Sequence, residues 1–431
     1  MLEQIALNPK QKAIVVSVVS PTLPTHQTIE QTQKNIDELK ELLRTLDIQV
    51  VEQFIQQKNT LESSTLLGKG KWESIQKESE HLETNLVVFD GELTASQVKN
   101  IHELTKLQVV DRSYVILEIF SQNAKTKIAK LQMNISRLEY LMPRLTSLWG
   151  HFTKQKGGIG LRSGEGEQQL ELDRRIVRKK IEMYKDQLEK AKTAMAQKKK
   201  KRNRYVSTAA LVGYTNAGKS SLMNALTKSE VLVENKLFAT LDSTCKALNP
   251  NSHPPMVLMD TVGFISQLPA NLFEGFKTTL ESAMDAQLLL IVCDVSSKDV
   301  TQHLEVTLKT LEDLNVEKKR RLFIFNKRDL LKDQIDYQAW KLLRHQYRPN
   351  VLVSAQDELD MKALRDQILE IFLKEQARYD LFIPFYEAMA ISTVKSSTNI
   401  IKEHTHEKGM FFRIRVPKEH FSQLGLQNFL L

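Results

Sequence analysis

Near the middle of the 431-residue chain stands the sequence Gly213-Tyr214-Thr215-Asn216-Ala217-Gly218-Lys219-Ser220. It follows the apolar run 208–212 and precedes a segment of helical character at 221–227. In the pattern Gly-x4-Gly-Lys-Ser, the glycines let backbone N–H groups surround phosphate oxygens, and the helix dipole favours the same negative charge. Lys219 would bring a positive charge to the β- and γ-phosphates, and Ser220 would give Mg²⁺ an oxygen ligand. The motif therefore predicts a nucleotide-binding P-loop domain.

A second motif lies forty positions after Ser220, where another apolar run ends. It consists of Asp260, Thr261, Val262 and Gly263. A carboxylate at its first position can hold the Mg²⁺ shell, and the backbone amide of its glycine can reach a γ-phosphate. The two motifs together predict a nucleoside triphosphate bound with Mg²⁺.

The segment between these motifs offers the threonine that closes over Mg²⁺ when a γ-phosphate is present. It reads Phe238-Ala239-Thr240-Leu241-Asp242-Ser243-Thr244. Thr240 is the preferred candidate, and Thr244 is its competitor. Ser220 and Thr240 are then the predicted metal ligands, and the predicted catalytic residues are Lys219, Thr240 and Gly263.

The remaining motifs favour guanine over adenine. Asn326, Lys327 and Asp329 stand at the end of one strand-like run, and Ser354 and Ala355 follow the next. The Asp329 carboxylate can accept hydrogen bonds from N1–H and the 2-amino group of guanine, whereas adenine presents an acceptor at N1. The last pair suits a backbone contact with guanine O6. Four motifs in this order, each at the carboxyl end of a strand, predict a GTP site in an α/β fold.

Two positions bear on hydrolysis itself. Phe264 follows Gly263 at a position where many GTPases carry a water-orienting Gln. Either the apolar side chain leaves hydrolysis slow until a partner reorders the site, or it packs into the core and another residue orients water. Asn216 is a candidate to help bind a monovalent cation such as K⁺, a hypothesis that equal GTPase rates in K⁺ and Na⁺ would contradict.

Upstream of the P-loop, the first hundred residues alternate between strand-like and helical patterns. The strand-like runs are 13–19, 48–54, 86–89 and 107–110, and the helical patterns are 28–46, 72–79 and 94–105. This alternation predicts βαβ units and a small parallel sheet.

Two apolar stripes then predict an antiparallel helical hairpin. The first stripe is Ile128, Leu131, Ile135, Leu138 and Met142; the second is Val177, Ile181, Tyr184, Leu188, Ala191 and Met195. Pro143 should end the first helix because it lacks a backbone donor. A long Gly-rich loop, roughly 144–166, is expected between the helices, and loops of this length tend to be functional or disordered.

The fold class is multidomain α/β, with a Rossmann-like P-loop GTPase domain. We predict an amino-terminal α/β domain at 1–112, the hairpin at 113–204, the GTPase domain at 205–377 and a small α+β domain at 378–431. Strands of the GTPase domain are expected at 207–212, 255–260, 288–294, 321–326 and 350–354, and those of the last domain at 381–385 and 410–416.

Composition narrows the functional classes. Only Cys245 and Cys293 occur, which excludes a disulfide framework and favours a reducing cytoplasm. No apolar run approaches the roughly 20 residues of a membrane-spanning helix, although peripheral membrane association stays open. Within the net charge of +9, residues 174–204 hold 14 Lys and Arg against three acids. This run is either a solvated helix face or a surface for a polyanion, most simply RNA.

These motifs resemble those of the HflX-type GTPases, within the Obg–HflX group. The chain is also similar to that family at Gly157-Gly158-Ile159-Gly160, at Leu170-Glu171-Leu172-Asp173-Arg174-Arg175, at Leu67-Gly68-Lys69-Gly70-Lys71 and at Val110-Asp111-Arg112. It departs from the family at Asn123, where an Arg is usual, and in the run 162–168.

The resemblance implies a cytoplasmic GTPase that binds the large ribosomal subunit and ribosomal RNA, with GTP and GDP as its nucleotides. It further implies that the hairpin and its Gly-rich loop act near the peptidyl-transferase centre, and that the protein splits stalled or idle ribosomes under stress. We expect a monomer. The alternative is a GTP-regulated RNA-binding or ribosome-assembly scaffold whose hydrolysis is incidental.

Overall fold

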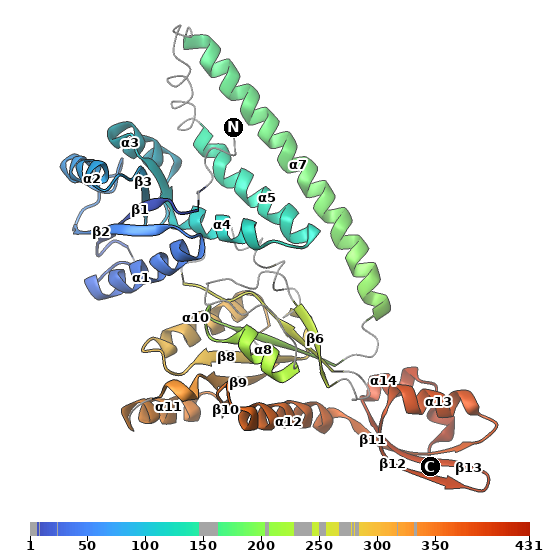
Figure 1. Ribbon diagram of the computed structural model, residues 1–431. Coiled ribbons are helices and arrows are strands. Elements are labelled where there is room, and N and C mark those ends of the chain that lie inside the picture. The colour runs from blue at the N-terminus through green and yellow to red at the C-terminus, as the bar shows by residue number, and fades with distance from the viewer. Residues whose placement is uncertain are drawn as a thin grey trace. The chain divides into compact units, whose positions relative to one another are not determined.

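The computed structural model divides into two compact units, one made mainly of residues up to Lys192 and the other mainly of residues from Thr193 onward (Figure 1). It describes residues 7, 9–23, 25–145, 163–202, 207–227, 244–249, 256–266, 277, 280, 284–316, 318–331 and 334–431. Among these residues, no helix combines the length and the apolar character needed to cross a membrane.

The first unit begins with a four-stranded parallel sheet in the order β2-β1-β3-β4. Its strands are β1 (Lys12–Val19), β2 (Gln49–Gln57), β3 (Leu86–Phe89) and β4 (Gln108–Asp111), joined by helices α1 (Ile29–Thr45), α2 (Lys69–His81) and α3 (Ala95–Thr105). The Thr28 side chain caps α1, and a capping box formed by Thr94 and Gln97 starts α3. The expected alternation is confirmed.

Several buried charged side chains lie at the carboxyl end of this sheet. Asp90, which follows β3, accepts a hydrogen bond from Arg112 at 3.2 Å and lies 2.9 Å from His26 Nε2. Arg112 is also ion-paired with Glu38. Asp111, the last residue of β4, accepts a 2.8 Å hydrogen bond from the hydroxyl of Tyr140. Because buried charges require partners, this network fixes the sheet to the helices that follow it.

The helical hairpin is confirmed by its core. Helix α4 (Arg112–Asn123) leads into α5 (Lys127–Leu141), the short η2 (Met142–Arg144) and the long α7 (Ser163–Arg202). Both predicted stripes contribute to one cluster, made of Leu131, Ile135, Leu138, Leu145, Val177, Ile181 and Leu188. Lys185 adds an ion pair to Glu139 at 2.8 Å. The α-helix α5 ends just before Pro143, as expected.

Two expectations for the hairpin are wrong. Met195 is 56% exposed and lies beyond the packed stripe. The loop was expected to extend to residue 166, but α7 already begins at Ser163 and includes Gly164 and Gly166. Glycine has a low helix propensity, so this stretch carries no local signal for the helix that continues through it. Residues 146–162, with Lys154, Lys156, Gly157, Gly158, Gly160 and Arg162, lie outside the described residues.

The second unit contains a six-stranded sheet in the order β10-β9-β8-β5-β7-β6. Its strands are β5 (Ser207–Gly213), β6 (Thr244–Asn249), β7 (Met256–Asp260), β8 (Leu288–Asp294), β9 (Arg320–Asn326) and β10 (Asn350–Leu352). The helices are α8 (Lys219–Thr227), α10 (Val300–Asp313), α11 (Gln334–Gln346) and α12 (Glu358–Glu375). The five expected strands are present, while the antiparallel edge strand β6 was not predicted.

A small antiparallel sheet in the order β11-β13-β12 completes this unit. It is built from β11 (Ala377–Pro384), α13 (Ala388–Ser397), β12 (Asn399–His406), β13 (Gly409–Val416), α14 (Lys418–Gln423) and η4 (Gln427–Phe429). Val394 of α13 and Phe421 of α14 pack on one face of the sheet. Two of its strands agree with the expected runs, and the exposed β12 was not predicted.

Candidate nucleotide-binding site

The carboxyl ends of four parallel strands bring the four sequence motifs to one edge of the large sheet. β5 runs into the P-loop, β7 ends at Asp260, β9 ends at Asn326, and β10 is followed by Ser354. Open α/β sheets bind ligands outside the carboxyl ends of their strands. The order of the strands therefore assembles one candidate site from segments far apart in the sequence.

Two glycines of the P-loop are required by geometry. Gly213 has φ +153°, and a Cβ there would collide with the carbonyl oxygen of Val292 on β8. Gly218 has φ +90°, and a Cβ there would collide with the side-chain amide of Asn326. Both positions favour glycine because an L side chain meets strain as well as crowding. Asn216 between them has φ 59°, a conformation that asparagine tolerates.

Lys219 is buried at the start of α8 and is 7% exposed. Its Nζ donates hydrogen bonds to the carbonyl oxygens of Gly213 at 3.1 Å and Tyr214 at 2.8 Å. Burial lowers the pKa of Lys219 to about 8, and the neighbouring Asp260 carboxylate opposes that shift. A nucleotide phosphate beside the ammonium would supply the missing negative charge and raise this pKa.

This pKa predicts a pH-dependent affinity for GTP. Above about pH 8, Lys219 of the nucleotide-free protein is increasingly neutral, so GTP binding must take up a proton. The dissociation constant for a fluorescent GTP analogue should therefore rise between pH 8 and 9, with a limiting slope of about tenfold per pH unit. The matched control is Lys219→Arg, because a guanidinium stays charged over this pH range. The affinity of this variant for the GTP analogue should therefore change only with the titration of the nucleotide itself. Equal slopes for both proteins would contradict the prediction.

Ser220 and Asp260 bring together two oxygen ligands suited to Mg²⁺. The Ser220 hydroxyl donates to Asp260 Oδ2 at 2.7 Å, and Asp260 is fully buried at the end of β7. A hydroxyl and a carboxylate are hard oxygen ligands of the kind that Mg²⁺ prefers. Thr261 is directed elsewhere, because its hydroxyl donates to the carbonyl oxygen of Leu211 at 2.6 Å. Phe238, Ala239, Thr240, Leu241 and Asp242 lie outside the described residues.

The segment after Asp260 is hydrogen-bonded to the P-loop. Phe264 N–H donates to Gly213 O at 3.0 Å, and Thr215 N–H donates to Phe264 O at 2.8 Å. A Cβ on Gly263 would lie 2.8 Å from Thr215 Cα and 2.9 Å from Lys219 Nζ, so glycine permits the close approach. The Phe264 side chain is 1% exposed. The Phe264 side chain therefore packs into the core, which is the part of the second alternative that the structure tests.

Asn326 joins three of the motifs. Its Nδ2 donates to the carbonyl oxygen of Ala217 in the P-loop at 3.0 Å, and its Oδ1 accepts from Ala355 N–H at 3.2 Å. Beside it, the hydroxyl of Ser354 donates to Asp329 Oδ1 at 2.5 Å. The residues predicted to recognise guanine are therefore held together and against the phosphate-binding loop.

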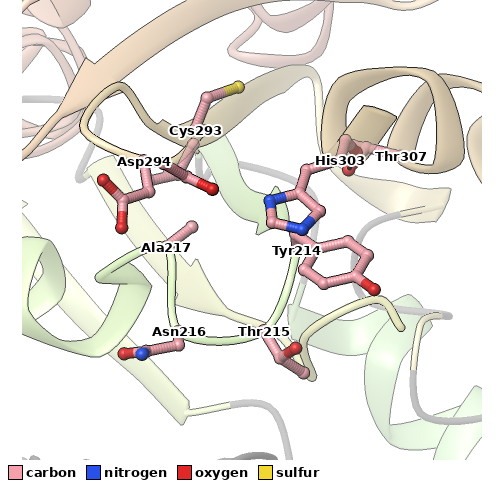
Figure 2. A pocket seen from close by; sticks show the side chains of 10 residues that line it. Tyr214, Thr215, Asn216, Ala217, Cys293, Asp294, His303 and Thr307 are labelled. Carbon is pink, nitrogen blue, oxygen red and sulfur yellow. Dashed lines mark hydrogen bonds between the residues drawn. The ribbon is translucent and has the colours of Figure 1, made fainter. Parts of the chain in front are cut away.

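Sequence reasoning missed the contribution of β8 and α10. Asp294, the last residue of β8, forms a 2.7 Å ion pair with Lys327 Nζ. A cavity of about 160 Å³ lies between this strand end, the P-loop and α10 (Figure 2). Within it, His303 stacks on Tyr214 with ring centroids 3.9 Å apart, and the Tyr214 hydroxyl accepts from Ser266 N–H at 2.8 Å. The signal available in the sequence was that Asp294 also ends a strand at this edge.

A parallel α/β sheet carrying a P-loop, an Asp-x-x-Gly segment and an Asn-Lys-x-Asp segment at one edge defines the class of P-loop GTPases. Family models described as "GTP-binding GTPase N-terminal", "GTP-binding GTPase Middle Region" and "50S ribosome-binding GTPase" match residues 33–121, 123–202 and 208–327. The chain belongs to the HflX family of GTPases, and it is a GTP-hydrolysing enzyme.

Relatives match three quarters of the chain or more. It is 34% identical to GTPase HflX of Caldanaerobacter subterraneus subsp. tengcongensis, over 100% of this chain and 96% of the relative. It is 42% identical to GTPase HflX of Flavobacterium psychrophilum, over 77% of this chain and 78% of the relative. A solved GTP-binding protein from the archaeon Sulfolobus solfataricus, in complex with GDP, is 21% identical with a TM-score of 0.46, covering 84% of this chain and 98% of that one.

Proposed function

We propose that this GTPase binds the large ribosomal subunit and ribosomal RNA and couples GTP hydrolysis to ribosome splitting or rescue under stress. The observation that carries the proposal is the long helix α7. The buried side chains of its apolar stripe pack on α5, while Arg175, Arg178, Lys179 and Lys180 are exposed on its surface. Exposed cations along one helix favour the polyanion interpretation of this segment, since phosphate contacts dominate binding to nucleic acids.

Within the nucleotide site, we assign roles by the chemistry of each group. Ser220 and Thr240 would hold Mg²⁺, which when bound neutralises charge on the phosphates. Asp329 would select guanine, and the Gly263 amide would contact the γ-phosphate. Lys219 would exchange its two carbonyl partners for the β- and γ-phosphates. Asn216 remains our candidate for a K⁺ contact.

Partner control follows from the residues around Phe264. An apolar side chain that is buried cannot orient the attacking water, so the isolated enzyme should hydrolyse GTP slowly. GTP would order the segments around Thr240 and Phe264, and hydrolysis would release them. We place this switch in the domain spanning 205–377, and the RNA contact in the hairpin spanning 113–204. The domains 1–112 and 378–431 flank them in a protein that we expect to be cytoplasmic and monomeric.

The decisive experiment measures the GTPase rate with and without purified large ribosomal subunits. We expect the subunits to raise the GTPase rate tenfold or more. In GTPases whose partner supplies or orders a missing catalytic group, the hydrolysis rate rises by far more than that. No stimulation would instead favour a GTP-regulated RNA-binding or assembly scaffold with incidental hydrolysis.

A matched control separates the helix from the nucleotide site. The double substitution Lys179→Ala/Lys180→Ala should weaken subunit binding and lower the stimulation, while the unstimulated rate stays unchanged. Raising the salt concentration should weaken binding of the unchanged protein, because each phosphate contact releases counterions. Binding that does not respond to salt would contradict the role of the basic helix.

A further inference from the structure

One face of the carboxy-terminal sheet carries a row of aromatic rings with basic side chains beside it. In an antiparallel sheet, directly paired residues point to the same face, and successive residues of a strand point to opposite faces. Leu381, Phe412 and Ile414 belong to the core that α13 and α14 cover. Figure 1 shows both helices on one side of the three strands. Phe382 and Phe411, their neighbours along the strands, therefore lie on the opposite, open face.

An aromatic row crosses all three strands on this open face. Phe382 of β11 pairs with Phe411 of β13, which pairs with His404 of β12. His406 lies beside the row, with its ring centroid 6.1 Å from that of Phe382 and the rings nearly perpendicular at 76°. The two phenylalanines are half-buried and the two histidines are exposed. The row thus offers ring surface to a ligand rather than to the core.

Basic side chains flank the row. The next paired positions are Asp380, Arg413 and Lys402, followed by Arg378 and Arg415. Asp380 is bound by Arg413 through hydrogen bonds of 2.7 and 2.8 Å, so its charge is already matched. Four cations against one carboxylate leave a charge of +3 on these positions (4 − 1). The open face is therefore suited to a polyanion.

We propose that this open sheet face binds single-stranded RNA. Unpaired bases would stack on the aromatic row of Phe382, Phe411 and His404, and phosphates would contact Arg378, Arg415 and Lys402. Single-stranded nucleic acids are recognised in this way, by ring stacking beside a positively charged track. The carboxylates of an acidic protein would use the cations, whereas unpaired bases carry both the phosphates for the cations and the planar rings that stack on the aromatic row. This site is separate from the basic helix α7, so it does not depend on the proposed function.

Photo-crosslinking in the full-length protein tests the site directly. The probe is a single-stranded decaribonucleotide containing 4-thiouridine, irradiated with the protein and mapped by mass spectrometry. We expect cross-linked peptides that cover β11 and β13. Cross-links confined to the hairpin, or none at all, would overturn the proposal. Because the probe has no ribosomal sequence, this result is independent of any stimulation of GTP hydrolysis by ribosomal subunits.

Matched variants identify the chemistry of the contact. In Phe382→Leu/Phe411→Leu, the apolar volume is retained but the ring surface is lost, so the cross-link yield at β11 and β13 should fall about tenfold. The control Tyr386→Ala removes a ring that is 84% exposed but lies beyond the end of β11, and it should change nothing. Melting temperatures would verify that each variant folds. An undiminished yield in the double variant, with polyglutamate competing as well as RNA, would indicate an acidic protein partner and contradict the proposal.

Discussion

Replacing Lys219 by alanine is expected to lower the single-turnover rate of GTP hydrolysis roughly a thousandfold, because one preorganised charge at the transferring phosphate is lost from a buried site. Lys219 Nζ is the cation that lies among the P-loop carbonyls and within reach of Gly263. Its removal should also weaken GTP binding, since water that fills the space left by the side chain carries no positive charge. Single-turnover kinetics at saturating enzyme separate the two effects.

The stability of the variant distinguishes a chemical role from unfolding. Truncating Lys219 removes the desolvation cost of a buried ammonium but also its hydrogen bonds to Gly213 and Tyr214. Because these two effects oppose each other, the melting temperature of the nucleotide-free protein should stay close to its original value. Lys219→Met keeps most of the volume and should be equally inactive. Lys309→Ala, on the exposed surface of α10, should retain full activity. Hydrolysis at the original rate in Lys219→Ala would overturn the assignment of the P-loop.

Much of the nucleotide site could be predicted from the sequence because its requirements are local. Gly213 and Gly218 have the spacing of a loop that wraps around phosphates, and the P-loop and the Asn326 motif each follow a run of buried strand residues. The hairpin could be predicted equally well, because its two apolar stripes are regular helical repeats. Leu131 and Val177, one from each stripe, belong to the same buried cluster.

The parts that could not be predicted depend on contacts between distant residues. The ion pair of Asp294 with Lys327 exists because β8 and β9 are neighbours in the sheet, and the stacking of His303 on Tyr214 depends on where α10 packs. The edge strand β6 carries Lys and Asn and is partly exposed, so it lacks the apolar run by which the other strands are recognised. Strand order and edge pairing are set by the whole domain rather than by any segment.

Replacing Asp329 by asparagine is expected to change the base specificity of the site from guanine to xanthine. Guanine presents two donors, N1–H and the 2-amino group, which a carboxylate can accept together. The oxygen of an asparagine amide can still accept from N1–H, but its NH₂ would face the 2-amino group and leave that group without an acceptor, so GTP affinity should fall roughly a hundredfold or more. Xanthine carries a carbonyl oxygen at that position and would accept from the amide. Competition binding with GTP and xanthosine triphosphate measures the exchange.

The structure also explains why the substitution should leave the rest of the site intact. Asp329 Oδ1 accepts from the hydroxyl of Ser354, and an asparagine oxygen can accept the same hydrogen bond. Asn326 would continue to join Ala217 and Ala355, so the P-loop keeps its shape. Xanthosine triphosphate should then be hydrolysed by Asp329→Asn at a rate close to that of GTP in the original enzyme. If the affinities for GTP and for xanthosine triphosphate fell to the same extent, Asp329 would support the loop and would not recognise the base.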